Sequence, residues 1–190
     1  MMKRPARGPV AAILTALLAV AGAASPAHAE EDELALTLGA GAWIESATVG
    51  DAEIASVAPI ALVGLRYGLS DFWQLGGSVT AGVSLSGDHD PAFVGTAHLE
   101  AYYFLDVVTW VLYGMAGAGV LVRDAHPDVL AGTASGPGFD LSVLAGLGLD
   151  YRPARDWSLG LAIRYHVVVT DLDRTSPTLS ATLGWTAYFE

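Results

Sequence analysis

The chain has 190 residues, a formal net charge of −11 and no cysteine. The acidic balance argues against nucleic acid as a partner. The absence of cysteine excludes disulfide bonds, thiol catalysis and thiolate metal sites. A chain of this length predicts a single folded domain.

The first 29 residues have the pattern of a cleavable secretory signal peptide. Three basic residues precede an apolar run from Val10 to Ala24, and Ala27-His28-Ala29 offers small residues at a cleavage site. An uncleaved anchor helix is the alternative, but the apolar run is shorter than the roughly twenty residues that a membrane span needs. The remaining domain, residues 30–190, keeps six Arg, no Lys and a formal charge of −14.

The stretch from Trp73 to Leu85 shows the pattern on which the fold prediction depends. Large apolar residues alternate with Gly, Ser, Thr and Gln, so one strand face is apolar and the other is small, polar and almost uncharged. A soluble strand would direct charged side chains to water. A small polar face instead fits the interior of a closed barrel whose apolar face meets lipid.

The same alternation recurs along the rest of the chain. Pro59 should make the second strand start late or bulge, because proline cannot donate to a ladder. The nearly continuous apolar run in the fifth strand could also form a short membrane helix, but its glycines disfavour a helix. The predicted strands are residues 34–45, 54–67, 73–85, 92–105, 109–123, 139–151, 157–169 and 178–189. The sequence therefore predicts an all-β, eight-stranded, up-and-down antiparallel barrel.

The predicted connections alternate in length. Those after the second, fourth and sixth strands are short, while those after the other strands are longer; the polar segment 46–53 is the first and Asp124–Gly138 is the longest. Short turns at one rim and long loops at the other, with both termini on the short-turn side, are typical of outer-membrane barrels. The acidic run 30–33 before the first strand is expected to be solvated.

Aromatic residues occur where strands meet the short turns. In a membrane barrel, this position corresponds to the inner bilayer interface, where Trp and Tyr form a girdle. A soluble core would scatter them along the middle of the strands. The predicted aromatic girdle is Tyr67, Trp73, Tyr103, Trp110, Tyr151, Trp157 and Phe189.

The signal peptide, the eight amphipathic strands and the aromatic final strand resemble the small Gram-negative outer-membrane barrels of the OmpA-transmembrane, OmpX and OmpW kind. In that superfamily the last strand carries an insertion signal, which Thr182, Gly184, Ala187 and Phe189 match. The match departs in having Glu190 after the terminal aromatic residue and only alanine at the apolar position. The resemblance implies export, insertion by the barrel-assembly machinery and contact with outer-membrane lipid.

Several polar and charged residues fall on the predicted inward face. Charges in a narrow interior must be paired, because an unpaired buried charge is strongly destabilising. We expect a structural plug, with a gate for ions or small solutes as the alternative. This predicted lumen network is Arg66, Gln74, His98, Glu100, Tyr102, Asp150, Arg164 and His166.

Two other kinds of chemistry are weighed against that plug. His98 and Glu100 could belong to a hydrolase, but no recognisable serine motif accompanies them. The segments Asp88–Asp90 and Asp124–Asp128 could converge on a divalent cation, although acidic loop tips are common in acidic proteins. We therefore expect no enzyme activity, no metal and no cofactor.

An eight-stranded barrel is just wide enough for side chains to fill, so a wide diffusion pore is excluded. The function that the sequence favours is a structural or surface-interaction barrel in the outer membrane, with an unidentified surface partner. A narrow gated channel is the alternative.

Overall fold

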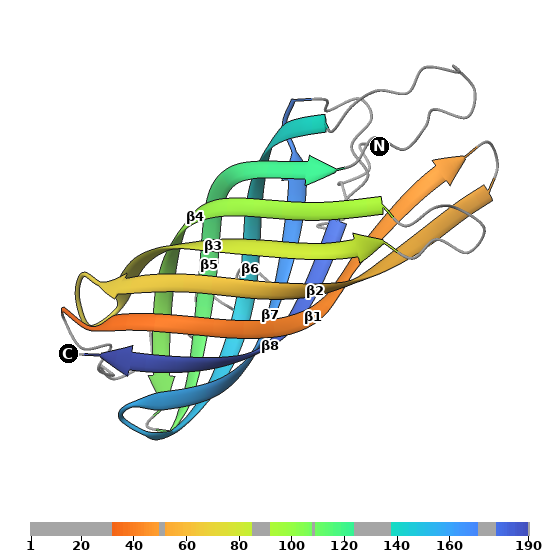
Figure 1. The fold of residues 1–190 in the computed structure, drawn as a ribbon. Helices are drawn as coiled ribbons and strands as arrows, with labels where there is room; N and C mark the ends of the chain where they lie inside the picture. The colour runs from red at the N-terminus through yellow and green to blue at the C-terminus, as the bar shows by residue number, and fades with distance from the viewer. Residues whose placement is uncertain are drawn as a thin grey trace, which may run out of the picture.

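The structure is a computed structural model that describes residues 32–49, 52–84, 92–107, 109–123, 138–170 and 178–189. Eight strands pair in sequence order, each antiparallel to the next, and β1 pairs with β8 to close the barrel (Figure 1). This confirms the predicted fold class. None of the described segments is a helix with the length and hydropathy needed to cross a membrane. The strands are β1 (Leu34–Val49), β2 (Ala52–Gly68), β3 (Trp73–Ser84), β4 (Ala92–Val107), β5 (Trp110–Arg123), β6 (Gly138–Ala154), β7 (Trp157–Val168) and β8 (Thr178–Phe189).

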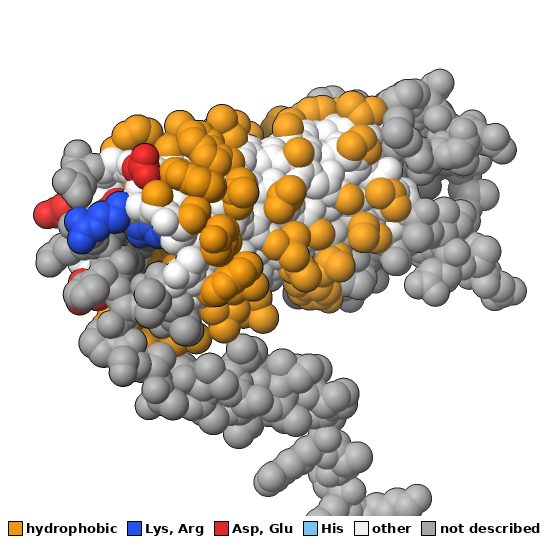
Figure 2. All heavy atoms as spheres, turned by 90° about the horizontal axis from the view of Figure 1, so that it is seen from below, with side chains coloured by type: hydrophobic (Ala, Val, Ile, Leu, Met, Phe, Trp, Pro, Cys, Tyr) orange, Lys and Arg blue, Asp and Glu red, His pale blue; other side chains and the backbone are white. Residues whose placement is uncertain are grey.

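The outer wall of the barrel is apolar. Most large aliphatic residues point outward and most small and polar residues point inward, as expected for a period of two residues. On the face seen in Figure 2, hydrophobic side chains cover the wall, and charged side chains of described residues gather at the short-turn end. Representative outward side chains are at least 45 % exposed: Leu75, Val79, Leu147, Leu161 and Leu183.

The prediction of a long connection between the first two strands is wrong. β1 and β2 continue through the polar segment and pair up to Val49 and Ala52, which leaves residues 50–51 between them. Figure 1 shows this hairpin extending past the neighbouring strands. Polar residues do not prevent pairing there, because main-chain groups form the ladder. The other connections keep the predicted alternation, and Phe189 ends β8 at the short-turn rim.

Pro59 neither delays β2 nor causes a bulge, contrary to the prediction. It pairs with Ala42 in an unbroken register with β1, and the pairing of β2 with β3 begins one residue later, at Ile60. Proline is tolerated at such a position because the strand has no second paired neighbour there. The register shift in the barrel lies instead between Tyr151 and Ala154, where β6 approaches its turn into β7.

The interior holds more large apolar side chains than the sequence pattern predicted. One buried apolar cluster lies toward the long-loop end and another toward the short-turn end. An eight-stranded barrel has room for such side chains and for little else. The first cluster, here called the upper apolar layer, is Trp43, Ala58, Ile60, Val94, Leu121 and Val168. The second is Tyr102, Phe104, Tyr113, Met115, Leu144 and Ala162.

Candidate functional site

Inward glycines determine where the large interior side chains lie. A Cβ on Gly148 would overlap the ring of Tyr113, its register partner on β5. A Cβ on Gly117 would lie 2.9 Å from Cγ of Glu100, again its register partner. Tyr113 and Glu100 thus each lie over a glycine on an adjacent strand, and such pairing of large with small residues helps to fill a small barrel without overlap.

Arg66 lies in an aromatic cage near the short-turn end. Its guanidinium carbon is 5.3 Å from the ring centroid of Tyr102, 5.6 Å from that of Phe104 and 5.7 Å from that of Tyr113. Within about 6 Å, a cation is attracted to the face of an aromatic ring. Nη2 of Arg66 is 3.8 Å from Oδ2 of Asp150, which supplies the opposite charge. These five residues, here called the floor, come from β2, β4, β5 and β6 and are buried inside the barrel.

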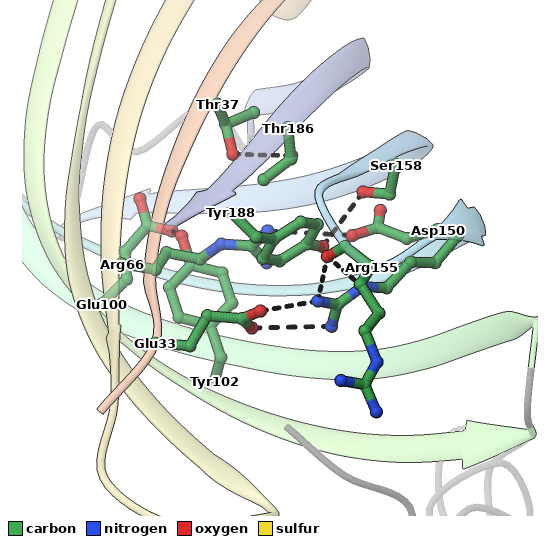
Figure 3. Close-up of polar contacts among 11 residues, drawn as sticks. Glu33, Thr37, Arg66, Glu100, Tyr102, Asp150, Arg155, Ser158, Thr186 and Tyr188 are labelled. Carbon is green, nitrogen blue, oxygen red and sulfur yellow. Dashed lines mark hydrogen bonds and ion pairs between the residues drawn. The ribbon is translucent and has the colours of Figure 1, made fainter. Parts of the chain in front are cut away.

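A second charged group lies beyond the floor, at the mouth of the barrel. The guanidinium carbon of Arg152 is 3.9 Å from the ring centroid of Tyr188, and its Nη2 is 2.5 Å from Oε1 of Glu33 (Figure 3). The hydroxyls of Ser158 and Tyr188 are 3.0 Å apart. Glu33 is only 3 % exposed. The expectation that the acidic run is solvated is therefore wrong for this residue, because Arg152 supplies a buried partner.

Glu100 is the centre of the next polar cluster. Its carboxylate accepts hydrogen bonds from the hydroxyls of Ser78 and Tyr102. Nε of Arg164 lies 4.0 Å from Oε2 of Glu100, and Nη1 of Arg164 donates to the hydroxyl of Thr182 at 3.0 Å. The interior thus holds two buried pairs of opposite charge, one in the floor and one above it.

Two histidines face each other above this cluster. The rings of His98 and His166 are 5.4 Å apart, and Trp43 packs on His166 at 4.6 Å. Nε2 of His98 is 2.8 Å from the hydroxyl of Ser142, and Nε2 of His166 is 3.0 Å from that of Ser180. Neither Nδ1 has a hydrogen-bond partner among the described residues. A serine hydrolase would need a carboxylate at that atom to orient the imidazole.

A cavity of about 30 Å³ lies between the floor and the Glu100 cluster. Several buried polar atoms around it have no hydrogen-bond partner among the described residues: Nε and Nη2 of Arg66, Nε of Arg164 and Oδ2 of Asp150. A water needs at least about 10–15 Å³ and two to four polar partners. The cavity therefore has the size and the polar lining for water, and it is too small for a larger solute.

The opposite rim carries a smaller charged group. Nη1 of Arg123 is 2.7 Å from Oε1 of Glu45, and its Nη2 is 3.1 Å from Oδ2 of Asp140. Thr170 donates to Asp140 at 2.9 Å. All three charged side chains are partly exposed, so water screens this group far more than the floor.

The structure brings most of the predicted lumen network into two clusters. Arg66 and Asp150 meet in the floor, and Glu100, Tyr102 and Arg164 meet above it. Gln74 is buried, with Oε1 unpartnered among the described residues. The prediction missed five residues of the interior and its mouth, although their inward position in the alternating pattern could have indicated them: Glu33, Trp43, Phe104, Tyr113 and Tyr188.

The residues predicted for the aromatic girdle lie on the outer wall. Two pairs contact each other across strands: Trp73 with Tyr103 at 5.0 Å, and Trp110 with Tyr151 at 4.9 Å. In the predicted insertion signal, Thr182 is buried inside, Gly184 shares its inward parity, and Ala187 and Phe189 have outward parity. The girdle members Tyr67, Trp157 and Phe189 complete the set at strand ends.

The predicted signal peptide and the two candidate metal-binding segments, Asp88–Asp90 and Asp124–Asp128, lie outside the described residues. The signal peptide remains a prediction, and the metal site remains the alternative that the sequence analysis did not favour. Among the residues that the structure describes, there is no group of three or more His, Cys, Asp and Glu side chains that could hold a metal ion.

Comparisons with known proteins agree with this architecture. A family model described as an outer membrane protein beta-barrel domain matches residues 15–186. A search of curated proteins found no match. Among solved structures, the N-terminal barrel domain of OprF from Pseudomonas aeruginosa is 16 % identical, with a TM-score of 0.61 over 84 % of this chain and 98 % of that one.

Two further solved structures have the same fold. Neisserial surface protein A is 13 % identical, with a TM-score of 0.59 over 82 % of this chain and 99 % of that one. Ail, the attachment invasion locus protein of Yersinia pestis, is 17 % identical, with a TM-score of 0.55 over 84 % of this chain and 100 % of that one. At these identities the likeness shows the fold alone.

Proposed function

The chain belongs to the outer membrane protein beta-barrel domain family, and from this membership we propose that it is a structural or surface-interaction barrel of the outer membrane, with a closed interior. The observation that carries the proposal is that large buried side chains occupy the interior at two levels. The floor holds Arg66 among three aromatic rings and Asp150. The upper apolar layer fills the lumen around Trp43.

The energetics of the floor support a stable plug. Opening it would separate the Arg66 guanidinium from Asp150 and from three aromatic rings. A buried charge that loses its partner costs several kcal/mol, typically about 3–5. The upper apolar layer adds a barrier of another kind, because ions do not shed their hydration in an apolar constriction.

The proposed partners follow from the outer wall and the connections. The wall has the apolar surface that suits outer-membrane lipid, and the final strand has the pattern through which the barrel-assembly machinery would insert the chain. The longer connections, residues 85–91, 124–137 and 169–177, follow the ends of strands opposite the short turns. We place any surface partner there, and residues 124–137 form the longest of these connections.

A narrow channel is the second candidate, because the interior has a wall of small residues. Thr37, Gly39, Gly64, Gly184 and Thr186 line the cavity on β8, β1 and β2, opposite the bulky floor residues. A rearrangement of the floor against this wall would open a thin polar path. This candidate requires the floor and the upper apolar layer to open together.

Catalysis is not part of the proposal. The two serine and histidine pairs lie inside the barrel, and the Glu100 carboxylate bonds to Ser78 and Tyr102 rather than to His98. This arrangement supplies no activated nucleophile. A lipid or peptide hydrolysis assay on the folded barrel is expected to show no turnover.

Single-channel recording in planar bilayers tests the closed interior. The wild-type barrel should give no sustained conductance. The double variant Trp43→Ala/Tyr113→Ala should conduct, because it removes one large ring from the upper apolar layer and one from the floor. Leu147→Ala on the outer wall is the matched control and should remain closed. Steady wild-type conductance would favour the channel instead.

A cell-fractionation experiment tests the location. The expressed full chain should appear in the outer-membrane fraction and should show the heat-dependent gel mobility of a folded barrel. Recovery in the soluble fraction as a folded protein would contradict the proposed location.

A further inference from the structure

A hollow lies at the short-turn end of the outer wall. It is a groove of about 430 Å³ over the seam between β7 and β8. Aromatic residues of β7 and β8 line most of it, together with one acidic residue of the turn between these strands. The residues that line it are Asp156, Trp157, Trp185, Ala187, Tyr188 and Phe189.

The cross-strand pairing explains why the hollow forms at this seam. At two other seams, β3–β4 and β5–β6, a tryptophan near the short-turn end packs on a tyrosine of the adjacent strand: Trp73 on Tyr103, and Trp110 on Tyr151. Trp157 instead pairs with Ala187, whose methyl group leaves the space beside the indole unfilled. Ala187 points outward but is only 9 % exposed, so it lies at the bottom of the groove.

The turn beside the groove presents one cation and one anion. Arg155 and Asp156 are both exposed, and neither side chain forms an ion pair with another described residue. The turn itself is held in place: Tyr188 N–H donates to the Asp156 carbonyl at 2.9 Å, and Arg152 donates to the Arg155 carbonyl. These hydrogen bonds hold the backbone of the turn, so Asp156 lines the groove and Arg155 is the residue before it in the chain. Figure 3 shows the Arg155 side chain directed away from the Arg152 cluster.

We propose that this groove binds a phospholipid whose headgroup carries a primary ammonium group. The ammonium would donate to Asp156 and lie near the faces of Trp157 and Trp185, because a carboxylate beside aromatic rings favours an organic cation. The phosphate would pair with Arg155. The upper part of an acyl chain would lie on Ala187 between the rings.

The charge pattern selects this headgroup over an anionic one. A headgroup with both signs matches Arg155 and Asp156, whereas an anionic headgroup without an amine leaves Asp156 facing negative charge. The position also fits, since the girdle residues around the groove belong at a bilayer interface. The inference rests on the proposed membrane location, and it adds a preferred lipid.

Native mass spectrometry of the detergent-purified full chain tests the proposal. Phosphatidylethanolamine, phosphatidylglycerol or phosphatidylcholine is added, and the lipid retained after detergent removal is counted. The wild type should retain phosphatidylethanolamine about tenfold more than phosphatidylglycerol, as expected from one extra charge-assisted contact. Phosphatidylcholine, which has no N–H to donate to Asp156, should fall between them.

Three variants separate the parts of the site. Asp156→Asn should remove the preference between the two lipids without changing the fold. Ala187→Leu should fill the groove and remove retention of all three lipids, and it keeps an apolar residue at that position of the insertion signal. Ala145→Leu, which adds the same volume elsewhere on the outer wall, is the control and should behave as wild type.

Equal retention of phosphatidylethanolamine and phosphatidylglycerol by the wild type would overturn the proposal. An unchanged preference in Asp156→Asn, or unchanged retention in Ala187→Leu, would also overturn it. These results leave the fractionation experiment unaffected, so failure of the lipid site is distinguishable from failure of the proposed location.

Discussion

Replacing Glu100 by alanine tests whether the charges inside the barrel form a structural plug. The carboxylate accepts from Ser78 and Tyr102, lies 4.0 Å from Nε of Arg164 and is 2 % exposed. Glu100→Ala removes all three interactions at once. It leaves two buried hydroxyls without their acceptor and one buried guanidinium without its counter-charge.

The expected loss of unfolding free energy is about 3–5 kcal/mol, the usual cost of removing one partner of a buried pair. The 4.0 Å separation between Arg164 and Glu100 favours the lower part of that range, because the Coulomb energy falls with distance. Glu100→Gln keeps the shape and one acceptor oxygen, so it should cost less, about 1–3 kcal/mol. The double variant Glu100→Gln/Arg164→Met should be less destabilised than the sum of its single variants, because it removes both charges.

Urea unfolding of the barrel in lipid vesicles measures these free energies, with tryptophan fluorescence and heat-dependent gel mobility as independent probes. Both probes should give the same midpoint for each variant. A Glu100→Ala barrel within about 0.5 kcal/mol of wild type, the range of an ordinary surface change, would refute the reasoning. Additive single and double variants would show that Glu100 and Arg164 do not interact.

Three further predictions concern the barrel wall and its rims. Gly119→Ala should greatly reduce the yield of folded barrel, because its Cβ would overlap a main-chain carbonyl of β4. Gly114→Ala on the same strand is the control and should fold normally, because the nearest atom to its Cβ is 3.9 Å away. Equal yields of the two variants would contradict this. Arg123→Ala should lower the unfolding free energy by at most about 1 kcal/mol, because its ion pairs are partly exposed, and 1 M salt should reduce this loss. A larger loss, or a loss that salt does not change, would contradict this prediction. Trp110→Ala should destabilise the barrel in vesicles by about 0.5–1.5 kcal/mol, because its ring contact with Tyr151 is lost. An unchanged urea midpoint would argue against a stabilising girdle.

The alternation of side chains along each strand made much of the fold predictable from the sequence. Because successive residues point to opposite faces, the pattern around Leu75 and Val79 predicted which side faces outward, and eight repeats of it predicted the closed barrel. It also assigned inward positions to Arg66, Glu100 and Arg164. The same reasoning misjudged the polar segment after β1, because main-chain pairing does not require apolar side chains.

The tertiary structure alone decided which inward residues meet across the lumen. Strand stagger places Arg66 of β2 beside Asp150 of β6 and Glu33 beside Arg152, and no spacing along the chain encodes those distances. The aromatic cage around Arg66 likewise depends on how far side chains reach, as when the ring of Tyr113 lies over Gly148 on the next strand. Local alternation is a property of one strand, whereas contact across a barrel depends on closure, register and side-chain length together, and these are settled only when the whole chain is folded.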